Sequence, residues 1–358
     1  MFDLNALIRP HILTLTPYAS ARDEYQGSEG TFLDANENAF GTPGQADDQP
    51  QYHRYPDPYQ RALKQRLADV KQVPPDHMFL GNGSDEIVDL IIKAFCRPGQ
   101  DNVVILPPTF GMYKVAAAVN DVPLHPAPLT EEYTIDETAL REAVDEHTKI
   151  IFFCSPNNPT GNLLDRTIIE RWIKDFSGLV VVDEAYGDFA DTPSFAEQLA
   201  DHPNLIVMQT LSKAWGMAAL RLGMAFASSD IVAVLNKIKM PYNVNRLTQE
   251  LAIELLTHAS EMRRTVQEIL TLRDQLAQEL ERLSIVQRVY PSDANFLFVK
   301  MQQADRVFAA LLEQQIIVRN QSKVQRCEGG FRITVGTPQE NQLLLNALAA
   351  VSEPSPTF

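Results

Sequence analysis

The chain has 358 residues, more than one hydrophobic core usually organises, so we expect two domains. Its formal net charge is −15, and 46 acidic residues against 31 basic ones exclude the basic surface that nucleic-acid binding requires. The three cysteines and seven histidines show no metal-like spacing, so we expect reduced cysteines, a cytoplasmic location and no metal site.

In chain order, residues 1–10 lack the basic and apolar regions of a signal peptide, and no later apolar run reaches the length of a membrane span. Residues 31–58 are rich in Pro, Gly, Asn and Asp, which predicts an irregular connection. Helical periodicity follows over residues 61–70 and 85–95. Short apolar runs typical of strands buried on both faces of a parallel sheet occupy residues 103–106, 150–154, 180–182 and 205–208. This alternation predicts an α/β domain.

The remaining third of the chain has a different order. Residues 246–283 show helical periodicity that is too long for one ordinary helix, with a possible break at residues 257–260. Strand-like runs at 294–299 and 331–335 and helical segments at 305–314 and 339–351 follow. We therefore expect a second, smaller α+β domain, with a boundary near residue 245.

Polar motifs follow several predicted strands, where open α/β sheets bind ligands. Residues 81–86 (GNGSDE) lead into a helix, and backbone N–H groups at a helix start can hold a phosphate. An ordinary turn with Ser84 or Asp85 as a helix cap explains this motif equally well. In residues 155–161 (SPNNPTG), two prolines fix a turn that leaves Asn157 near a strand end, although a simple rigid loop is the alternative.

Two charged residues complete the pattern. Asp183 follows a run of three valines, where a carboxylate is partly desolvated and favours a cationic partner; a helix cap is the alternative. Lys213 follows the run at 205–208, and desolvation there lowers the pKa of an amine, although a lone lysine is usually a solvated surface residue. An amine nucleophile, an acid and a phosphate cradle together match the requirements of pyridoxal phosphate.

At these residues the sequence resembles the fold-type I aminotransferases. The resemblance runs over most of the chain and rests on the order and spacing of short motifs, which are 9–10, 16–18, 34–38, 55–58, 81–86, 107–113, 155–161, 183–186, 213–221, 316–319 and 331–336. It implies a large domain with a mostly parallel seven-stranded sheet over residues 31–245 and a small domain over 246–358. Residues 1–30 are expected to form a segment that packs with the small domain.

The resemblance also implies roles for individual residues. Lys213 is expected to form the Schiff base with pyridoxal phosphate and then to act as general acid and base. Asp183 is expected to pair with the pyridine nitrogen, while Asn157 and Tyr186 donate to the ring oxygen. The residues expected around the cofactor phosphate are Gly83, Ser84, Asp85, Thr210, Ser212 and Arg221. Phe110, where the family commonly has Tyr, is expected to stack on the cofactor ring.

The remaining assignments concern the substrate and the partner subunit. The residues expected to contact substrate are Tyr18, Asn36, Arg319 and Arg332, with Arg332 at its anionic end. A surface ion pair is the alternative for each arginine. Tyr55 is expected to reach the cofactor phosphate of the neighbouring subunit, which implies a homodimer with shared sites.

The resemblance implies a reaction that transfers an amino group between L-histidinol phosphate and 2-oxoglutarate. Aromatic amino-acid transamination and decarboxylation of threonine phosphate remain alternatives on the same scaffold. A catalytically inactive binding or regulatory homologue is a further alternative, although Lys213 and Asp183 are both present and no basic DNA-binding extension is found. A nicotinamide-binding dehydrogenase is disfavoured because Glu86 stands where a third glycine is required.

Overall fold

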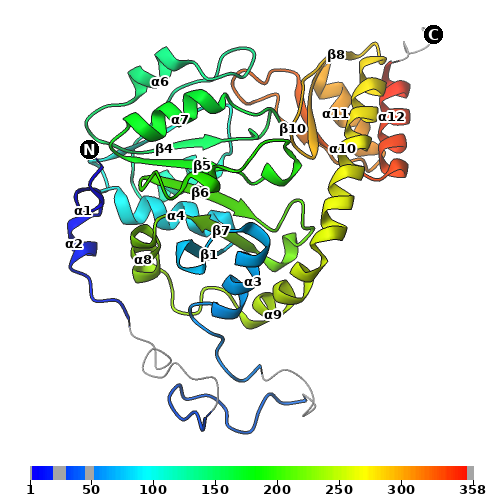
Figure 1. Cartoon of the computed structure of the whole chain (residues 1–358). Coiled ribbons are helices and arrows are strands. Elements are labelled where there is room, and N and C mark those ends of the chain that lie inside the picture. The colour runs from blue at the N-terminus through cyan, green and yellow to red at the C-terminus, as the bar shows by residue number, and fades with distance from the viewer. Residues whose placement is uncertain (1, 19–29, 45–51, 353–358) are drawn as a thin grey trace.

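The computed structural model describes residues 2–18, 30–44 and 52–352. Its centre is a seven-stranded sheet in the order β1-β7-β6-β5-β4-β2-β3 (Figure 1). The strands are β1 Met78–Asn82, β2 Asn102–Ile105, β3 Leu124–Pro126, β4 Thr148–Cys154, β5 Leu179–Asp183, β6 Leu205–Thr210 and β7 Leu222–Phe226. Strands β3, β2, β4, β5 and β6 pair in parallel, and β7 pairs antiparallel with both β6 and β1. The prediction of a mostly parallel seven-stranded sheet is confirmed.

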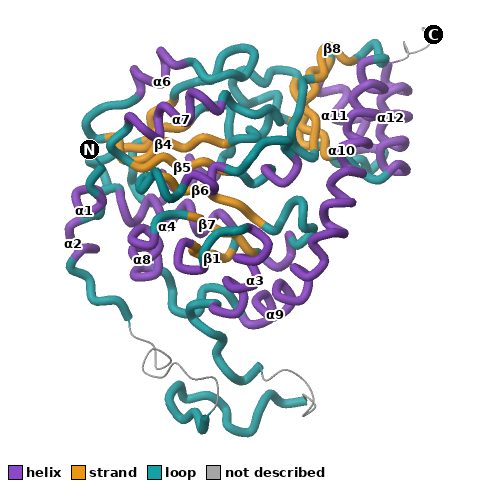
Figure 2. Tube along the Cα trace, viewed as in Figure 1, coloured by secondary structure: helices purple, strands orange, loops and turns teal. Residues whose placement is uncertain are grey.

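Helices cover both faces of this sheet (Figure 2). They are α3 Arg61–Lys71, α4 Ser84–Phe95, α5 Met112–Val119, α6 Glu137–Ala143, α7 Arg166–Asp175 and α8 Ser229–Ile238. Consecutive residues of a strand point to opposite faces, so Val180 belongs to the core beneath α7 while Val181 belongs to the core beneath α4. Burial on both faces explains why these strands read as continuous apolar runs. Short 3₁₀ helices lie at Pro75–His77, Gly187–Phe189, Phe195–Gln198, Ala218–Leu220 and Leu256–His258.

A second domain contains an antiparallel sheet in the order β10-β11-β9-β8. Its strands are β8 Val286–Val289, β9 Phe296–Met301, β10 Arg319–Asn320 and β11 Gly330–Thr334, and its helices include α11 Ala304–Glu313 and α12 Pro338–Ser352. These elements share a separate hydrophobic core that includes Leu276, Leu280, Phe331 and Leu348. The expected small α+β domain is therefore present.

The junction between the domains lies further along the chain than residue 245. Helix α9, Arg246–Leu255, packs against α3, and α10, Ala259–Glu281, follows it. Val266 of α10 belongs to the large-domain core, whereas Leu276 of the same helix belongs to the small-domain core. Figure 1 shows α10 running from one domain to the other.

The N-terminal segment packs on the large domain, contrary to the expectation that it would pack with the small one. It contains α1, Leu4–Leu7, and α2, Pro10–Leu13. Ile8 and Ile12, four residues apart, are buried in the core that α4 and α8 share. Lys237 Nζ also donates to the Leu13 carbonyl at 2.8 Å. The expected role of residues 19–29 lies outside the described residues.

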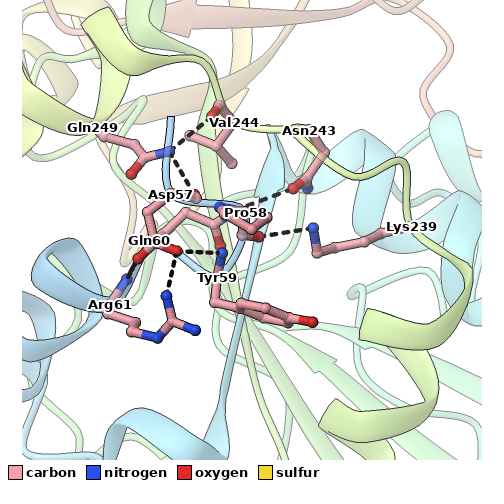
Figure 3. A network of polar contacts seen from close by, with 9 residues as sticks. All are labelled: Asp57, Pro58, Tyr59, Gln60, Arg61, Lys239, Asn243, Val244 and Gln249. Carbon is pink, nitrogen blue, oxygen red and sulfur yellow. Dashed lines mark hydrogen bonds and ion pairs between the residues drawn. The ribbon is translucent and has the colours of Figure 1, made fainter. Parts of the chain in front are cut away.

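Residues 30–44 lie in a loop that stands away from the body of the molecule (Figure 2). The chain returns to the body at a turn that is fixed by polar contacts (Figure 3). Asp57 accepts hydrogen bonds from the backbone N–H groups of Tyr59 and Arg61, at 3.0 and 2.7 Å. Lys239 Nζ and Gln249 Nε2 donate to the carbonyls of Pro58 and Asp57, at 2.9 and 3.2 Å. The turn before α3 is thus tied to Lys239, which precedes α9, and to Gln249 within α9.

Candidate active site

A cavity of about 180 Å³ lies at the carboxyl ends of β4, β5 and β6, the edge where parallel sheets bind ligands. It is lined by Ser84, Asp85, Phe110, Cys154, Asn158, Asp183, Ala185, Tyr186, Thr210, Ser212, Lys213, Arg221 and Arg332. Residues from both domains therefore meet here. Ten of these thirteen residues are among those that the sequence analysis selected.

Lys213 follows β6 by three residues and opens onto this cavity. Its Nζ lies 5.6 Å from the centre of the Tyr186 ring. Desolvation lowers the pKa of this amine, and the positive charge of Arg332 lowers it further, while Asp183 opposes the shift. A lowered pKa increases the fraction of neutral amine, which is the nucleophilic form.

Asp183 is the last residue of β5 and is only 2% exposed. Its Oδ2 accepts a hydrogen bond of 2.6 Å from the Tyr113 hydroxyl, and its Oδ1 accepts one of 3.0 Å from the Ala185 N–H. Burial raises the pKa of this carboxyl to about 6, although both hydrogen bonds favour the ionised form. A cation placed in the cavity would lower this pKa again, so the site is suited to a protonated ring nitrogen.

The loop after β4 corrects one assignment. Asn157 is buried and turned away from the cavity, because its Nδ2 donates to the Pro108 carbonyl and to Thr160 Oγ1, at 2.9 and 2.7 Å. Its neighbour Asn158 lines the cavity instead. Asn158 Nδ2 donates to the Tyr186 hydroxyl at 3.4 Å. Sequence analysis identified the right loop but selected the wrong one of its two adjacent asparagines. Adjacent side chains in this loop point in different directions, so only Asn158 reaches the cavity.

A phosphate-sized anion has several donors at the other end of the cavity. Ser84 is the first residue of α4, and no side chain caps that helix, so its first backbone N–H groups point toward the cavity without a capping partner. Arg221 Nη2 lies 3.3 Å from Asp85 Oδ2. Gly83 has a φ of +81°, and a Cβ there would lie 2.8 Å from Arg221 Nη2. Glycine at this turn therefore leaves room for the guanidinium group.

Two hydroxyl groups extend the same set of donors. Thr210 Oγ1 donates to Ser212 Oγ at 3.0 Å and accepts from the Ser212 N–H at 3.1 Å. Both residues line the cavity between Lys213 and Arg221. The arrangement combines positive charge, a helix start and hydroxyl donors, which suits a phosphate group.

Arg332 brings a positive charge from β11 of the small domain. Its Nη1 donates to Asn158 Oδ1 at 2.6 Å, and its guanidinium lies 5.5 Å from the Phe296 ring centre. Arg319 on β10 is paired directly opposite Arg332, which places the two side chains on one face of the sheet. Arg319 itself is exposed and does not line this cavity.

Three further predicted residues lie elsewhere. Tyr18 is 75% exposed. Asn36 and Tyr55 line a different cavity of about 580 Å³, where the Tyr55 ring stacks on Tyr242 with centres 4.5 Å apart. Within this one chain these residues are not gathered with Lys213. Phe110 does line the cavity with Lys213, and its ring meets Tyr113 edge-on at 5.5 Å.

Tyr113 and Cys154 are additions that sequence reasoning missed. Tyr113 belongs to the motif at 107–113, but nothing in the pattern showed that its hydroxyl reaches Asp183. Cys154 is paired with Asp183 across β4 and β5, and burial raises the pKa of its thiol above the usual range.

In the part of the chain that the structure describes, no group of three or more His, Cys, Asp or Glu side chains could hold a metal ion. No helix within the described ranges is long and apolar enough to cross a membrane.

The chain is similar in sequence to known aminotransferases over most of its length. The sequence model of the family described as "Aminotransferase class I and II" matches residues 24–348. The histidinol-phosphate aminotransferase of Parabacteroides distasonis is 54% identical over 348 residues, which cover 97% of this chain and 99% of that protein.

Two solved structures share the fold. The histidinol-phosphate aminotransferase from Sinorhizobium meliloti, in complex with pyridoxal-5'-phosphate, superposes with a TM-score of 0.76 at 23% identity and covers 96% of this chain and 97% of that one. The L-threonine-O-3-phosphate decarboxylase from Porphyromonas gingivalis gives 0.71 at 26% identity, with 83% and 93% covered. The fold is thus shared by proteins that are named for two different reactions, a transamination and a decarboxylation.

Proposed function

Because the chain belongs to the family of class I and II aminotransferases, we propose that it transfers the amino group of L-histidinol phosphate to 2-oxoglutarate, with pyridoxal phosphate as cofactor. One observation carries this proposal. A lysine, a buried carboxylate and two arginines from different domains line a single cavity, namely Lys213, Asp183, Arg221 and Arg332. The reaction belongs to histidine biosynthesis and runs in the cytoplasm, where the buried free cysteines stay reduced.

The donor set fits the cofactor at both ends. Pyridoxal phosphate supplies an electron sink once its ring nitrogen is protonated. The ionised Asp183 carboxylate holds a proton on that nitrogen, and Tyr186 and Asn158 donate to the ring oxygen. The phosphate is held by the N–H groups of Ser84 and Asp85, with Gly83 making room, and by Thr210, Ser212 and Arg221. Phe110 provides the aromatic face for the ring.

Lys213 has two tasks in this scheme. Its Nζ anchors the cofactor covalently, which requires a neutral amine, and the lowered pKa increases that fraction. With substrate and cofactor bound, the Lys213 amine would carry the proton between the substrate Cα and C4′ of the cofactor. Positioned proton transfer of this kind contributes roughly 10²–10⁴-fold in rate.

Arg332 binds the anionic end of the substrate. Both substrates are anions, since histidinol phosphate carries a phosphate ester and glutamate a carboxylate, and an arginine fork binds either group. Arg319, on the same face of the small-domain sheet, adds positive potential, and Tyr18 and Asn36 contact the substrate from the N-terminal part of the chain. Their distance from Lys213 within one chain is consistent with sites completed by a second subunit.

We propose a homodimer in which Tyr55 reaches the cofactor phosphate of the neighbouring subunit. The loop at residues 30–44 stands away from the body, and it carries Leu33 and Phe40, which are 86% and 100% exposed. Burying these two side chains against a second subunit would stabilise a dimer through the hydrophobic effect. Tyr55 lies on the return path of the same segment, on a cavity separate from that of Lys213.

The test is absorbance of the cofactor-loaded protein after addition of L-histidinol phosphate alone. The visible band should disappear with release of imidazole-acetol phosphate and return with 2-oxoglutarate, whereas Lys213→Ala should show neither change. A protein that holds the cofactor but ignores histidinol phosphate would overturn the substrate. Release of CO₂ from threonine phosphate would then indicate the decarboxylase, and a response to aromatic amino acids the other transaminase.

A further inference from the structure

Tyr113 contacts Asp183 but is not among the residues that line the cavity. Its hydroxyl is 2.6 Å from Asp183 Oδ2, and its side chain is 0% exposed. It does not line the cavity, so it has no direct contact with a molecule bound there. The hydroxyl therefore acts on the site through the side chains that it touches, which are Asp183 and Cys154.

The Tyr113 ring is held in place from two sides. It stacks on Phe152 with ring centres 4.7 Å apart and an interplanar angle of 18°. On another side it meets the edge of Phe110 at 5.5 Å and 87°. Because both neighbours are aromatic and close, packing of the ring fixes the position of the phenol oxygen beside Asp183.

The two hydrogen bonds that Asp183 accepts within the protein leave its carboxylate able to accept a further one from the cavity. Oδ1 accepts from the Ala185 N–H at 3.0 Å, and Oδ2 accepts from Tyr113 at 2.6 Å. Two donors on different oxygens fix the plane of the carboxylate, and each oxygen retains a lone pair for a further donor. The cavity is the side from which that donor can approach.

We propose that Tyr113 is a positioning residue that keeps the Asp183 carboxylate ionised and oriented toward the cofactor's ring nitrogen. This inference rests on the proposed function, in which Asp183 pairs with that nitrogen. A donor to a carboxylate favours its charged form, which counteracts the cost of burying the charge. Through Phe110, the same ring also supports the aromatic face of the site.

Other groups also face Asp183 and influence its charge. Lys213 favours the ionised carboxylate, while Glu184 disfavours it. Cys154 and Tyr186 interact with it from β4 and from the turn after β5, and burial raises the pKa of both groups above their usual ranges. Both groups are therefore neutral near pH 7, which leaves Lys213 and Tyr113 as the side chains that stabilise the charge.

The experiment compares Tyr113→Phe with Tyr133→Phe. Tyr133 is a matched control because it is also buried, at 1% exposed, and its hydroxyl donates to the Arg326 carbonyl at 2.7 Å. Each change removes one buried phenol hydrogen bond, and only the first removes it from Asp183. The unfolding free energy of each cofactor-free protein, measured in urea, separates a folding defect from a binding defect.

The dissociation constant of pyridoxal phosphate and the pH titration of its visible band are the readouts. Tyr113→Phe should weaken cofactor binding by about 10–100-fold and shift the titration, while Tyr133→Phe should match the wild type. In the Asp183→Asn background the Tyr113 change should have little added effect, since the two residues act as one unit. That non-additivity is not expected of a purely structural tyrosine.

The two proposals fail in different ways. Asp183→Asn should itself weaken cofactor binding; if it does so while Tyr113→Phe behaves like Tyr133→Phe, only the positioning role is overturned. If Asp183→Asn binds the cofactor as the wild type does, the assignment of Asp183 in the proposed function fails, and the role of Tyr113 fails with it. Equal and additive effects of Tyr113→Phe in both backgrounds also overturn the positioning role.

Discussion

Arg332 Nη1 donates a hydrogen bond of 2.6 Å to Asn158 Oδ1, and this bond joins the two domains across the candidate active site. Arg332 belongs to β11 of the small domain, and Asn158 belongs to the loop after β4 of the large one. A guanidinium group has five N–H donors, so this bond fixes its orientation and leaves a fork free for an anion. Asn158 thus orients the group that we propose binds substrate.

The neighbouring asparagines predict opposite phenotypes. Asn158→Ala should lower kcat/KM for histidinol phosphate by about tenfold or more, because Arg332 and the ring oxygen each lose a partner. Asn157→Ala should instead lower the free energy of unfolding by about 1–3 kcal/mol, because the Pro108 carbonyl and Thr160 Oγ1 lose a buried donor. Steady-state kinetics and urea denaturation of both variants distinguish these effects. The reverse assignment would return Asn157 to the site.

Gly83→Ala should weaken cofactor binding by about tenfold, because its Cβ would meet Arg221 Nη2 at 2.8 Å and displace it. Gly99→Ala is the control, since its φ of +65° imposes similar backbone strain while its nearest contact is an Asp121 oxygen at 3.7 Å. Both substitutions should lower the free energy of unfolding by about 1 kcal/mol or more, because each places a Cβ on a residue with positive φ. Cofactor titration should show a defect only in Gly83→Ala, and equal affinities would mean that Arg221 does not hold the phosphate.

The charge of Asp183 predicts a pH dependence of the cofactor-free protein. Its pKa is raised to about 6 in the folded state, against 3.8 ordinarily, so the folded state binds this proton more tightly than the unfolded state. The contribution to stability is complete below about pH 4 and is lost as the pH rises through about 6. Asp183→Asn should therefore gain stability relative to the wild type as the pH increases from 4 to 7. Urea denaturation at several pH values tests this, and parallel pH curves would contradict the raised pKa.

Shared sites predict complementation between two inactive variants. Lys213→Ala and Tyr55→Ala homodimers should each have low activity. Mixing them after dissociation should restore roughly a quarter of the wild-type activity, because half of the dimers are mixed and each has one intact site. Mixing each variant with itself is the control. Without recovery, Tyr55 does not act on the neighbouring subunit.

The sequence was sufficient for the strands that are buried on both faces. The apolar runs at 103–106, 150–154, 180–182 and 205–208 fall on β2, β4, β5 and β6. Strands β1 and β7 contain glycine and β3 has only three residues, so their local patterns were too weak. These missing strands complete the sheet only through pairing with distant segments, which local periodicity does not reveal.

The site residues also fall into two groups, those that local sequence patterns predicted and those that depend on contacts between distant segments. Asp183 and Lys213 were predictable because strand ends on one edge of a parallel sheet converge, whereas Arg221, which precedes the antiparallel strand β7, was assigned from the family resemblance. The choice between Asn157 and Asn158 depended on the path of one loop, and the contact of Tyr113 with Asp183 joins residues 70 positions apart. Residues 2–18 pack on the large domain through Ile8 and Ile12, and apolar side chains of this kind fit either domain surface by composition alone.

Helix α10 restricts how the two halves of the site can move. Val266 fixes it in one core and Leu276 in the other, and the helix between them rises about 15 Å without interruption. Within the described residues, α10 is the covalent connection between the two domains, while Phe296 and Phe298 of β9 belong to the same core as Val266. Because the hydrogen bonds of an α-helix resist stretching along its axis, this uninterrupted helix keeps the two cores, and with them Arg332 and Lys213, at a fixed spacing along it.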